Sequence, residues 1–302
     1  MIAKTVIKTK TNAFVWYDIT ALTPSEQDIL STQHGFSPKI LAYAQDQHEH
    51  PRYDLQADST MLVYLAVIQK ANQYLTSPLT FIVKEQTCYT FHQPEAQVLI
   101  DELKQIINHK MLNDLPEFLL LTLYQMTLTF TNNLLKLNEI RSSLDEQLNH
   151  TITNDNLRNL AELEKSLIYL NSGAQTNLLM LENLKHLTLG QDLTKVKDDN
   201  ILLKDVLFEA RQAQRMAQIA SDVTAKISNT SNNILNNNLN NTMKFLTVWS
   251  LVLTIPTIIT GFYGMNVLLP TSQTHADWIL IILLNLGLIL VLIWYFKKKK
   301  LL

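Results

Sequence analysis

Two long apolar segments close the chain. The first runs from Phe245 to Tyr263 and the second from Trp278 to Phe296, and neither contains a charged residue. Because a helix rises about 1.5 Å per residue, each segment covers close to the roughly 30 Å of bilayer hydrocarbon. The pattern therefore predicts two transmembrane helices, at about 244–263 and at 278–296, joined by a short external loop at 264–277.

Residues 1–112 show a different pattern, with short apolar runs between turn residues, and predict a mixed α/β domain. Thr23, Pro24 and Glu26 have the spacing of a helix start, with Thr23 as the N-cap, Pro24 at N1 and Glu26 at N3. Runs of strand length occur at 14–19, 61–67, 79–83 and 86–91. The run at 86–91 is a candidate return strand of a hairpin.

Helical periodicity replaces this pattern from about residue 94 onward. Leucines at steps of three and four predict two long helices, at 118–148 and 154–187. A short polar turn divides them, and short connections favour antiparallel neighbours, so 113–199 is predicted to form an antiparallel helix pair that ends in a polar break.

A third helical pattern spans 200–263 and contains no breaker before Pro256. A periodic pattern this long is typical of a coiled coil or a transmembrane helix, so a stalk helix is predicted to run directly into the first span. A polar or small-residue seam follows it at alternating steps of three and four, which places its members on one face. The seam consists of Asn233, Asn236, Asn240, Met243, Thr247, Ser250, Thr254, Thr257, Gly261 and Gly264.

A polar face inside a membrane must meet protein or water rather than lipid. One interpretation is helix packing through small residues such as Gly261 and Gly264, and the other is a water-filled axis. The seam continues as asparagines outside the apolar segment, which favours the axis. One helix cannot enclose a pore, so this interpretation requires a symmetric ring of subunits.

The charges near the spans predict their orientation. Lys244 precedes the first span and Lys297 to Lys300 follow the second, in a basic tail at 297–302, whereas the loop contains no Lys or Arg. Cytoplasmic flanks carry the excess of Lys and Arg, so both termini are predicted inside the cell and the loop outside. The single Cys88 fits a reducing compartment.

Other function classes find little support in the composition. The formal net charge of -2 gives no argument for nucleic-acid binding. The chain contains no glycine-rich loop that would cradle phosphates and no convincing nucleophile or acid–base constellation. Neither ATP-driven transport nor enzyme activity is therefore expected.

The motif Tyr263-Gly264-Met265-Asn266, at the end of the penultimate span, resembles the signature of the CorA family of magnesium channels. Its position makes the match specific, and further segments at 243–247, 256–261, 16–24 and 46–54 also resemble the family. The resemblance implies an α+β membrane protein that forms a funnel-shaped homopentamer. Each subunit would have an N-terminal cytoplasmic α/β domain, a long helical stalk, a pore-lining first span and a lipid-facing second span in the cell membrane.

The resemblance also implies roles for individual residues. Tyr263 to Asn266 would form the selectivity filter, where Asn266 binds Mg²⁺ through the ion's hydration water. Met243 and Leu246 would form a hydrophobic constriction. The implied pore lining comprises Asn240, Met243, Leu246, Thr247, Ser250, Thr254, Thr257 and Gly261. By spacing alone, the pattern favours an ordinary helix C-cap at Gly264 followed by a left-handed residue at Asn266.

Gating in the family uses Mg²⁺ bound between cytoplasmic domains, so Mg²⁺ would be both the transported and the regulatory ion. Asp205 falls on an acidic stalk position of the family, and Asp46 is a candidate partner from the neighbouring subunit. The alternative for Asp205 is an ordinary solvated charge near a helix N-terminus.

The function implied is passive influx of hydrated Mg²⁺, with Co²⁺ and Ni²⁺ as further candidate ions, gated by intracellular Mg²⁺. A Zn²⁺ or other divalent-cation transporter of the same superfamily, proton-coupled in some members, is the first alternative. A membrane-anchored scaffold or sensor is the alternative from a different class.

Overall fold

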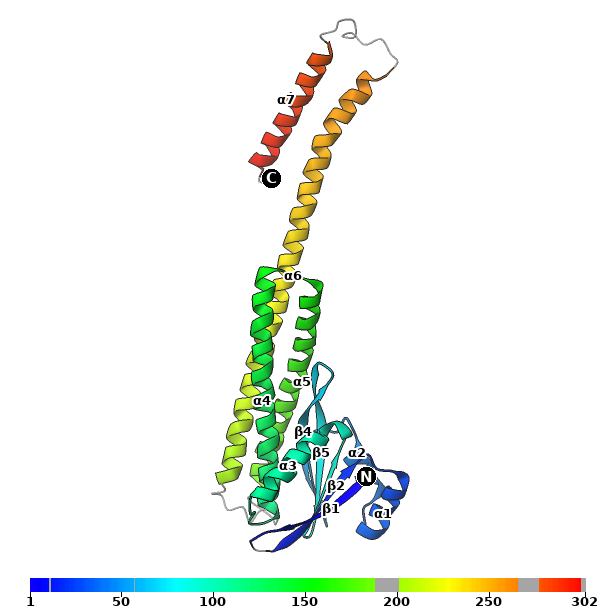
Figure 1. Cartoon of the computed structure of the whole chain (residues 1–302), viewed down its shortest axis with the longest axis vertical. Coiled ribbons are helices and arrows are strands. Elements are labelled where there is room, and N and C mark those ends of the chain that lie inside the picture. Colours follow the sequence, from blue (N-terminus) through cyan, green and yellow to red (C-terminus); the bar gives the residue numbers. More distant parts are fainter. Residues whose placement is uncertain (11, 57, 188–200, 266–276, 300–302) are drawn as a thin grey trace. The chain divides into compact units, whose positions relative to one another are not determined.

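The computed structural model describes residues 1–10, 12–56, 58–187, 201–265 and 277–299 (Figure 1). The chain divides into two compact units, 1–228 and 229–302. The first unit holds all the strands of the described residues, and the second holds the end of the long helix and the last helix.

The first unit is built around a six-stranded mixed sheet with the order β1-β2-β6-β5-β4-β3. Neighbouring strands are antiparallel except β2 and β6, which pair in parallel. The strands are β1 (Ile2–Lys8), β2 (Ala13–Thr20), β3 (Arg52–Leu55), β4 (Thr60–Lys70), β5 (Gln73–Lys84) and β6 (Thr87–His92). Strands β1 and β3 were not predicted, because β1 carries lysines on an exposed edge and β3 has only four residues.

Helices cover both faces of the sheet, which explains the continuous apolar runs of its central strands. On one face, Met61 and Val63 of β4 pack with Leu30 and Phe36 beneath α1 (Pro24–His34) and α2 (Pro38–Gln45). On the other face, Leu62 and Tyr64 pack against the long helices. The predicted start of α1 is confirmed, since Glu26 and Thr23 form a capping box.

Three helices follow the sheet along the chain: α3 (Gln97–His109), α4 (Leu115–His150) and α5 (Asn154–Leu187), after a short 3₁₀ turn η1 (Pro94–Ala96). Helices α4 and α5 lie against strands β4 and β5 (Figure 1). A Cβ atom at Gly173 of α5 would stand 2.7 Å from Thr76 Cγ2 of β5, so only glycine allows this close approach. The predicted polar break at 190–199 lies outside the described residues.

Helix α6 runs uninterrupted from Ile201 to Tyr263, as the unbroken periodicity predicts. Its first part packs on the bundle through small side chains, which permit close helix approach. These are Ala210, Ala213, Ala217 and Ala220. Helix α7 (Asp277–Lys298) is the second apolar helix, one residue longer at its start and two at its end than the predicted span.

Candidate ion pathway

Two helices, α6 and α7, contain segments long and apolar enough to cross a membrane. Only 11% of the most apolar window of α6 and 6% of that of α7 are buried within the chain. The core helix of a soluble protein would be mostly buried, so these two helices are better described as candidate membrane spans.

The two spans pack against each other along one narrow face. Val248 and Val252 of α6 are 5% and 9% exposed and form a cluster with Phe296 of α7, which is 8% exposed. Ile289 and Leu292 of α7 pack onto the same cluster. The C-terminal end of α7 therefore meets the N-terminal part of the apolar segment of α6, so the two spans are antiparallel (Figure 1).

The polar seam lies on the other side of α6. At 100° per residue, its members between 243 and 261 are centred about 150° around the helix axis from the covered positions 248, 252, 255 and 259. Every seam residue from Asn233 to Gly264 is exposed, whereas the covered positions are buried or half-buried. The chain's own second span therefore leaves the seam entirely free.

The threonines of the seam share one hydrogen-bond arrangement. Thr247 Oγ1 donates to the Met243 carbonyl at 2.8 Å, and Thr254 Oγ1 donates to the Ser250 carbonyl at 2.7 Å. Thr257 Oγ1 donates to a carbonyl one turn earlier in the same way, at 2.9 Å. Each hydroxyl hydrogen is thus used inside the helix, and the oxygen offers only acceptor capacity to whatever faces the seam.

The upper end of the seam is made of glycine. A Cβ atom at Gly261 would meet nothing within 4 Å, while one at Gly264 would stand 3.1 Å from the Thr260 carbonyl oxygen. The Gly264 amide also donates to that oxygen, at 2.8 Å. Gly264 directly follows the last residue of α6, so the C-cap position expected for it is confirmed, and among the described glycines only Gly35 has a positive φ. Asn266 and the rest of the predicted filter loop after Met265 lie outside the described residues.

Two apolar side chains lie at the lower end of the apolar segment, Met243 on the seam and Leu246 beside it. They are 59% and 65% exposed. Their role as a hydrophobic constriction stays a prediction, because it depends on what faces them in an assembly.

The two predicted regulatory carboxylates are both exposed. Asp205 lies in the second turn of α6, and Asp46 is the C-cap of α2, where its Oδ1 accepts the His48 backbone N–H at 2.9 Å. Within the described parts of the chain, no group of three or more His, Cys, Asp or Glu side chains is placed to hold a metal ion. The regulatory role of Asp46 and Asp205 stays a prediction.

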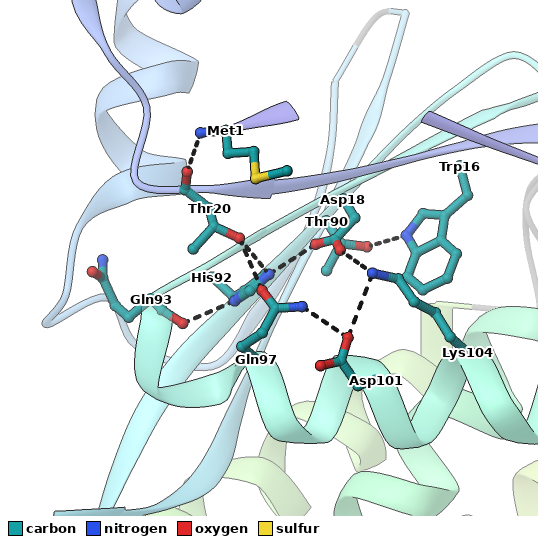
Figure 2. Close-up of polar contacts among 10 residues, drawn as sticks. All are labelled: Met1, Trp16, Asp18, Thr20, Thr90, His92, Gln93, Gln97, Asp101 and Lys104. Atoms are coloured by element: carbon teal, nitrogen blue, oxygen red, sulfur yellow. Dashed lines mark hydrogen bonds and ion pairs between the residues drawn. The ribbon is translucent and has the colours of Figure 1, made fainter. Parts of the chain in front are cut away.

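A buried charged cluster was missed by the sequence analysis (Figure 2). Asp18 of β2 contacts His92 Nε2 of β6 at 2.8 Å and Lys104 Nζ of α3 at 2.6 Å. The other ring nitrogen of His92 contacts the Gln93 carbonyl at 2.8 Å, and Nε2 also lies 3.0 Å from the Thr20 hydroxyl. The cluster ties α3 to two strands of the sheet.

The environment of Asp18 contains opposing effects on its ionisation. Burial alone would raise the pKa of its carboxyl, but hydrogen bonds and charges from His92 and Lys104 outweigh burial and lower the pKa below its ordinary value. An aspartate inside the apolar run 14–19 was the one sequence signal of this cluster, and its partners lie 74 and 86 residues away.

A family model described as "CorA-like Mg2+ transporter protein" matches residues 11–298. The chain belongs to this family. It is 24% identical over 295 residues to the "Cobalt/magnesium transport protein CorA" of Methanocaldococcus jannaschii, covering 94% of this chain and 90% of that protein.

Solved structures agree with this assignment at the level of the fold. The complete structure of the CorA magnesium transporter from the same archaeon superposes with a TM-score of 0.81 at 22% identity, covering 98% of this chain and 97% of that one. The ZntB cytoplasmic domain from Vibrio parahaemolyticus has a TM-score of 0.63 at 12% identity, covering 78% and 98%. The predicted order of an α/β domain, a long helix and two C-terminal apolar helices is confirmed.

Proposed function

We propose that this protein is a magnesium channel that lets hydrated Mg²⁺ enter the cell passively, with Co²⁺ and Ni²⁺ as further ions. The observation that carries the proposal is the free polar seam of α6, on the side turned away from α7. A relative that is named a cobalt/magnesium transport protein supports the class of ion. A polar face that the chain itself leaves uncovered in a membrane must meet water or further copies.

A homopentamer supplies those copies. Five α6 helices with their seams turned inward would enclose one axis, and five α7 helices would separate this ring from lipid. Both termini would be cytoplasmic, because lysines flank both spans and the connecting loop has none.

The threonine oxygens suit a hydrated cation. Mg²⁺ gives up its waters reluctantly, and those waters turn their hydrogens outward. Thr247, Thr254 and Thr257 would accept these hydrogens without stripping the ion, because their own hydrogens are already donated to the helix backbone. The same arrangement offers no donor to an anion, so the lining would favour cations.

The outer end of the axis would hold the filter. Tyr263 to Asn266 would form it, with Gly264 allowing close backbone approach and the Asn266 amide oxygen holding the hydrated ion weakly enough to release it. At the inner end, Met243 and Leu246 would close the path by dewetting. Mg²⁺ bound between subunits, with Asp205 and Asp46 as carboxylate ligands, would hold this gate shut when internal Mg²⁺ is high.

A pair of threonine variants tests the seam. Thr257→Val removes a seam hydroxyl, whereas Thr260→Val removes a hydroxyl with the same backbone hydrogen bond about 100° away from the seam. In liposomes, Thr257→Val should lower Mg²⁺ flux roughly two- to tenfold, the worth of one hydrogen bond, and Thr260→Val should leave flux unchanged. Equal effects of the two variants would contradict a pore-facing seam.

The filter and the ion class need a separate experiment. Asn266→Ala should abolish Mg²⁺ flux while the oligomer still assembles, and undiminished flux in an assembled oligomer would remove the filter assignment. Fluxes of Mg²⁺ and Zn²⁺ should be compared with and without a pH gradient. Proton-dependent Zn²⁺ flux without Mg²⁺ flux would support the zinc alternative, and an assembled protein that passes no divalent ion would support a membrane-anchored scaffold.

A further inference from the structure

The outer helix α7 carries one polar side chain that its apolar surroundings do not explain. Between Trp278 and Phe296, Asn285 is the only residue with an amide or a charge. The helix is exposed except along one stripe, and Asn285 lies within that stripe. The stripe consists of Ile281, Asn285, Ile289, Leu292 and Phe296. Asn285 therefore lies on the face that packs against α6.

Half of the Asn285 amide is satisfied. Its Nδ2 donates to the Ile281 carbonyl at 2.9 Å. Its Oδ1 is buried and has no hydrogen-bond partner in the part of the chain that the structure describes. An unsatisfied polar atom is costly where no water reaches it, so Oδ1 requires a donor from the face it packs against.

Counting along the two antiparallel helices identifies the level at which this donor must lie. Phe296 packs on Val248 and Val252. Asn285 lies eleven residues before Phe296 and Tyr263 lies eleven residues after Val252, so both are about 16 Å further along the pair at about 1.5 Å per residue.

The other hydroxyls near this level of α6 are already committed. Thr257 and Thr260 donate to the carbonyls of Leu253 and Pro256. Thr257 also lies on the seam, on the far side of the helix. Tyr263 is half-buried and lies about 50° around the α6 axis from the centre of the face that α7 covers. Of the described α6 hydroxyls near this level, that of Tyr263 is the one for which the structure shows no bond to the helix backbone, so it is the candidate donor to Oδ1.

We propose that the Tyr263 hydroxyl donates a hydrogen bond to Asn285 Oδ1 in the assembled membrane protein. Asn285 would thereby act as a positioning residue that anchors the first residue of the filter motif to the outer helix. The role in positioning the filter rests on the proposed channel function, whereas the contact between the two side chains does not.

A double-mutant cycle tests the role. Tyr263→Phe and Asn285→Leu each remove one partner with little change of shape, and each should lower Mg²⁺ flux in liposomes roughly three- to thirtyfold, the range of interhelical hydrogen bonds in membranes. The double variant should be no worse than either single variant, and Asn285→Gln should retain part of the flux. Additive losses, or wild-type flux in Asn285→Leu, would overturn the role.

Cross-linking tests the contact without relying on ion flux. Cysteines at 263 and 285, joined by a thiol-specific linker about as long as the missing phenol, should form a bond within one chain. The pair at 261 and 285 is the matched control, because Gly261 lies on the seam. No cross-link, or equal yields from both pairs, would overturn the contact. A specific cross-link in a protein that passes no ion would retain the contact and reject the channel.

Discussion

Replacing Asp18 by Asn should loosen the attachment of α3 to the sheet. The side chain of Asp18 is 6% exposed, that of His92 is fully buried and that of Lys104 is 32% exposed. Asn at this position removes the charge that faces both side chains. Lys104 can then turn to water, whereas the buried His92 ring cannot. Breaking a buried ion pair from one side costs about 3–5 kcal/mol, and because one cation can escape we expect the lower end, about 3 kcal/mol.

The loss of stability caused by Asp18→Asn should become smaller at acidic pH. The pKa of the Asp18 carboxyl lies below its ordinary value of 3.8 in the folded chain. A carboxyl whose pKa is lowered on folding contributes stability that is fully present above its unfolded value and is lost as pH falls through the folded value. The difference in stability between wild type and Asp18→Asn should therefore disappear only as the pH falls below 3.8 and through the folded pKa.

Hydrogen exchange on the full chain in detergent measures this local stability. A loss of about 3 kcal/mol corresponds to roughly a hundredfold faster amide exchange in β2 and α3. Asp101→Asn is the matched control, because Asp101 lies 3.7 Å from the same Lys104 but is 57% exposed, and such surface pairs contribute about 0–1 kcal/mol. Equal exchange in the two variants, or an Asp18→Asn effect that persists in acid, would refute the reasoning.

Three further predictions concern small residues. Gly173→Ala should lower the free energy of unfolding by about 1–3 kcal/mol, because the added Cβ would collide with Thr76. Gly287→Ala is the control and should not lower it, because the space around Gly287 is open. Thermal unfolding of the two variants measures the difference. Gly264→Ala should reduce Mg²⁺ flux in liposomes, since its Cβ would press on the carbonyl oxygen one turn earlier. Cys88 should resist maleimide in the folded protein, because it is buried and burial raises the pKa of its thiol to about 12.

The helices were predictable because their signals are local. The 3.6-residue period of 154–187 and the absence of a breaker after 200 set the length of α5 and α6, and Thr23 with Glu26 marked the start of α1. The two spans followed from apolar length alone. Each of these signals lies within a few turns of the chain and needs no knowledge of tertiary contacts.

The features that were missed depend on pairing between distant segments. The parallel pairing of β2 with β6 joins residues more than 70 positions apart, and it is this pairing that brings His92 to Asp18. The edge strand β1 is exposed or half-buried at all but one of its positions, so it has no apolar face that marks it as a strand. Likewise, the sequence placed the seam on one face of α6, but it did not reveal which face of that helix α7 covers.

The hydrogen bonds of the seam bear on the choice between helix packing and a water-filled axis. If identical copies packed seam to seam, Thr247 and Thr254 would face the same residues of a neighbour, and the remaining lone pairs of each oxygen would find no donor there. Their hydroxyl hydrogens are already donated to carbonyls of their own helix, so such a contact would bring acceptors together without a hydrogen between them. Water, or the water shell of a cation, supplies the missing hydrogens. The geometry of these threonines therefore favours a hydrated axis over dry packing, an argument that the three-four spacing alone could not provide.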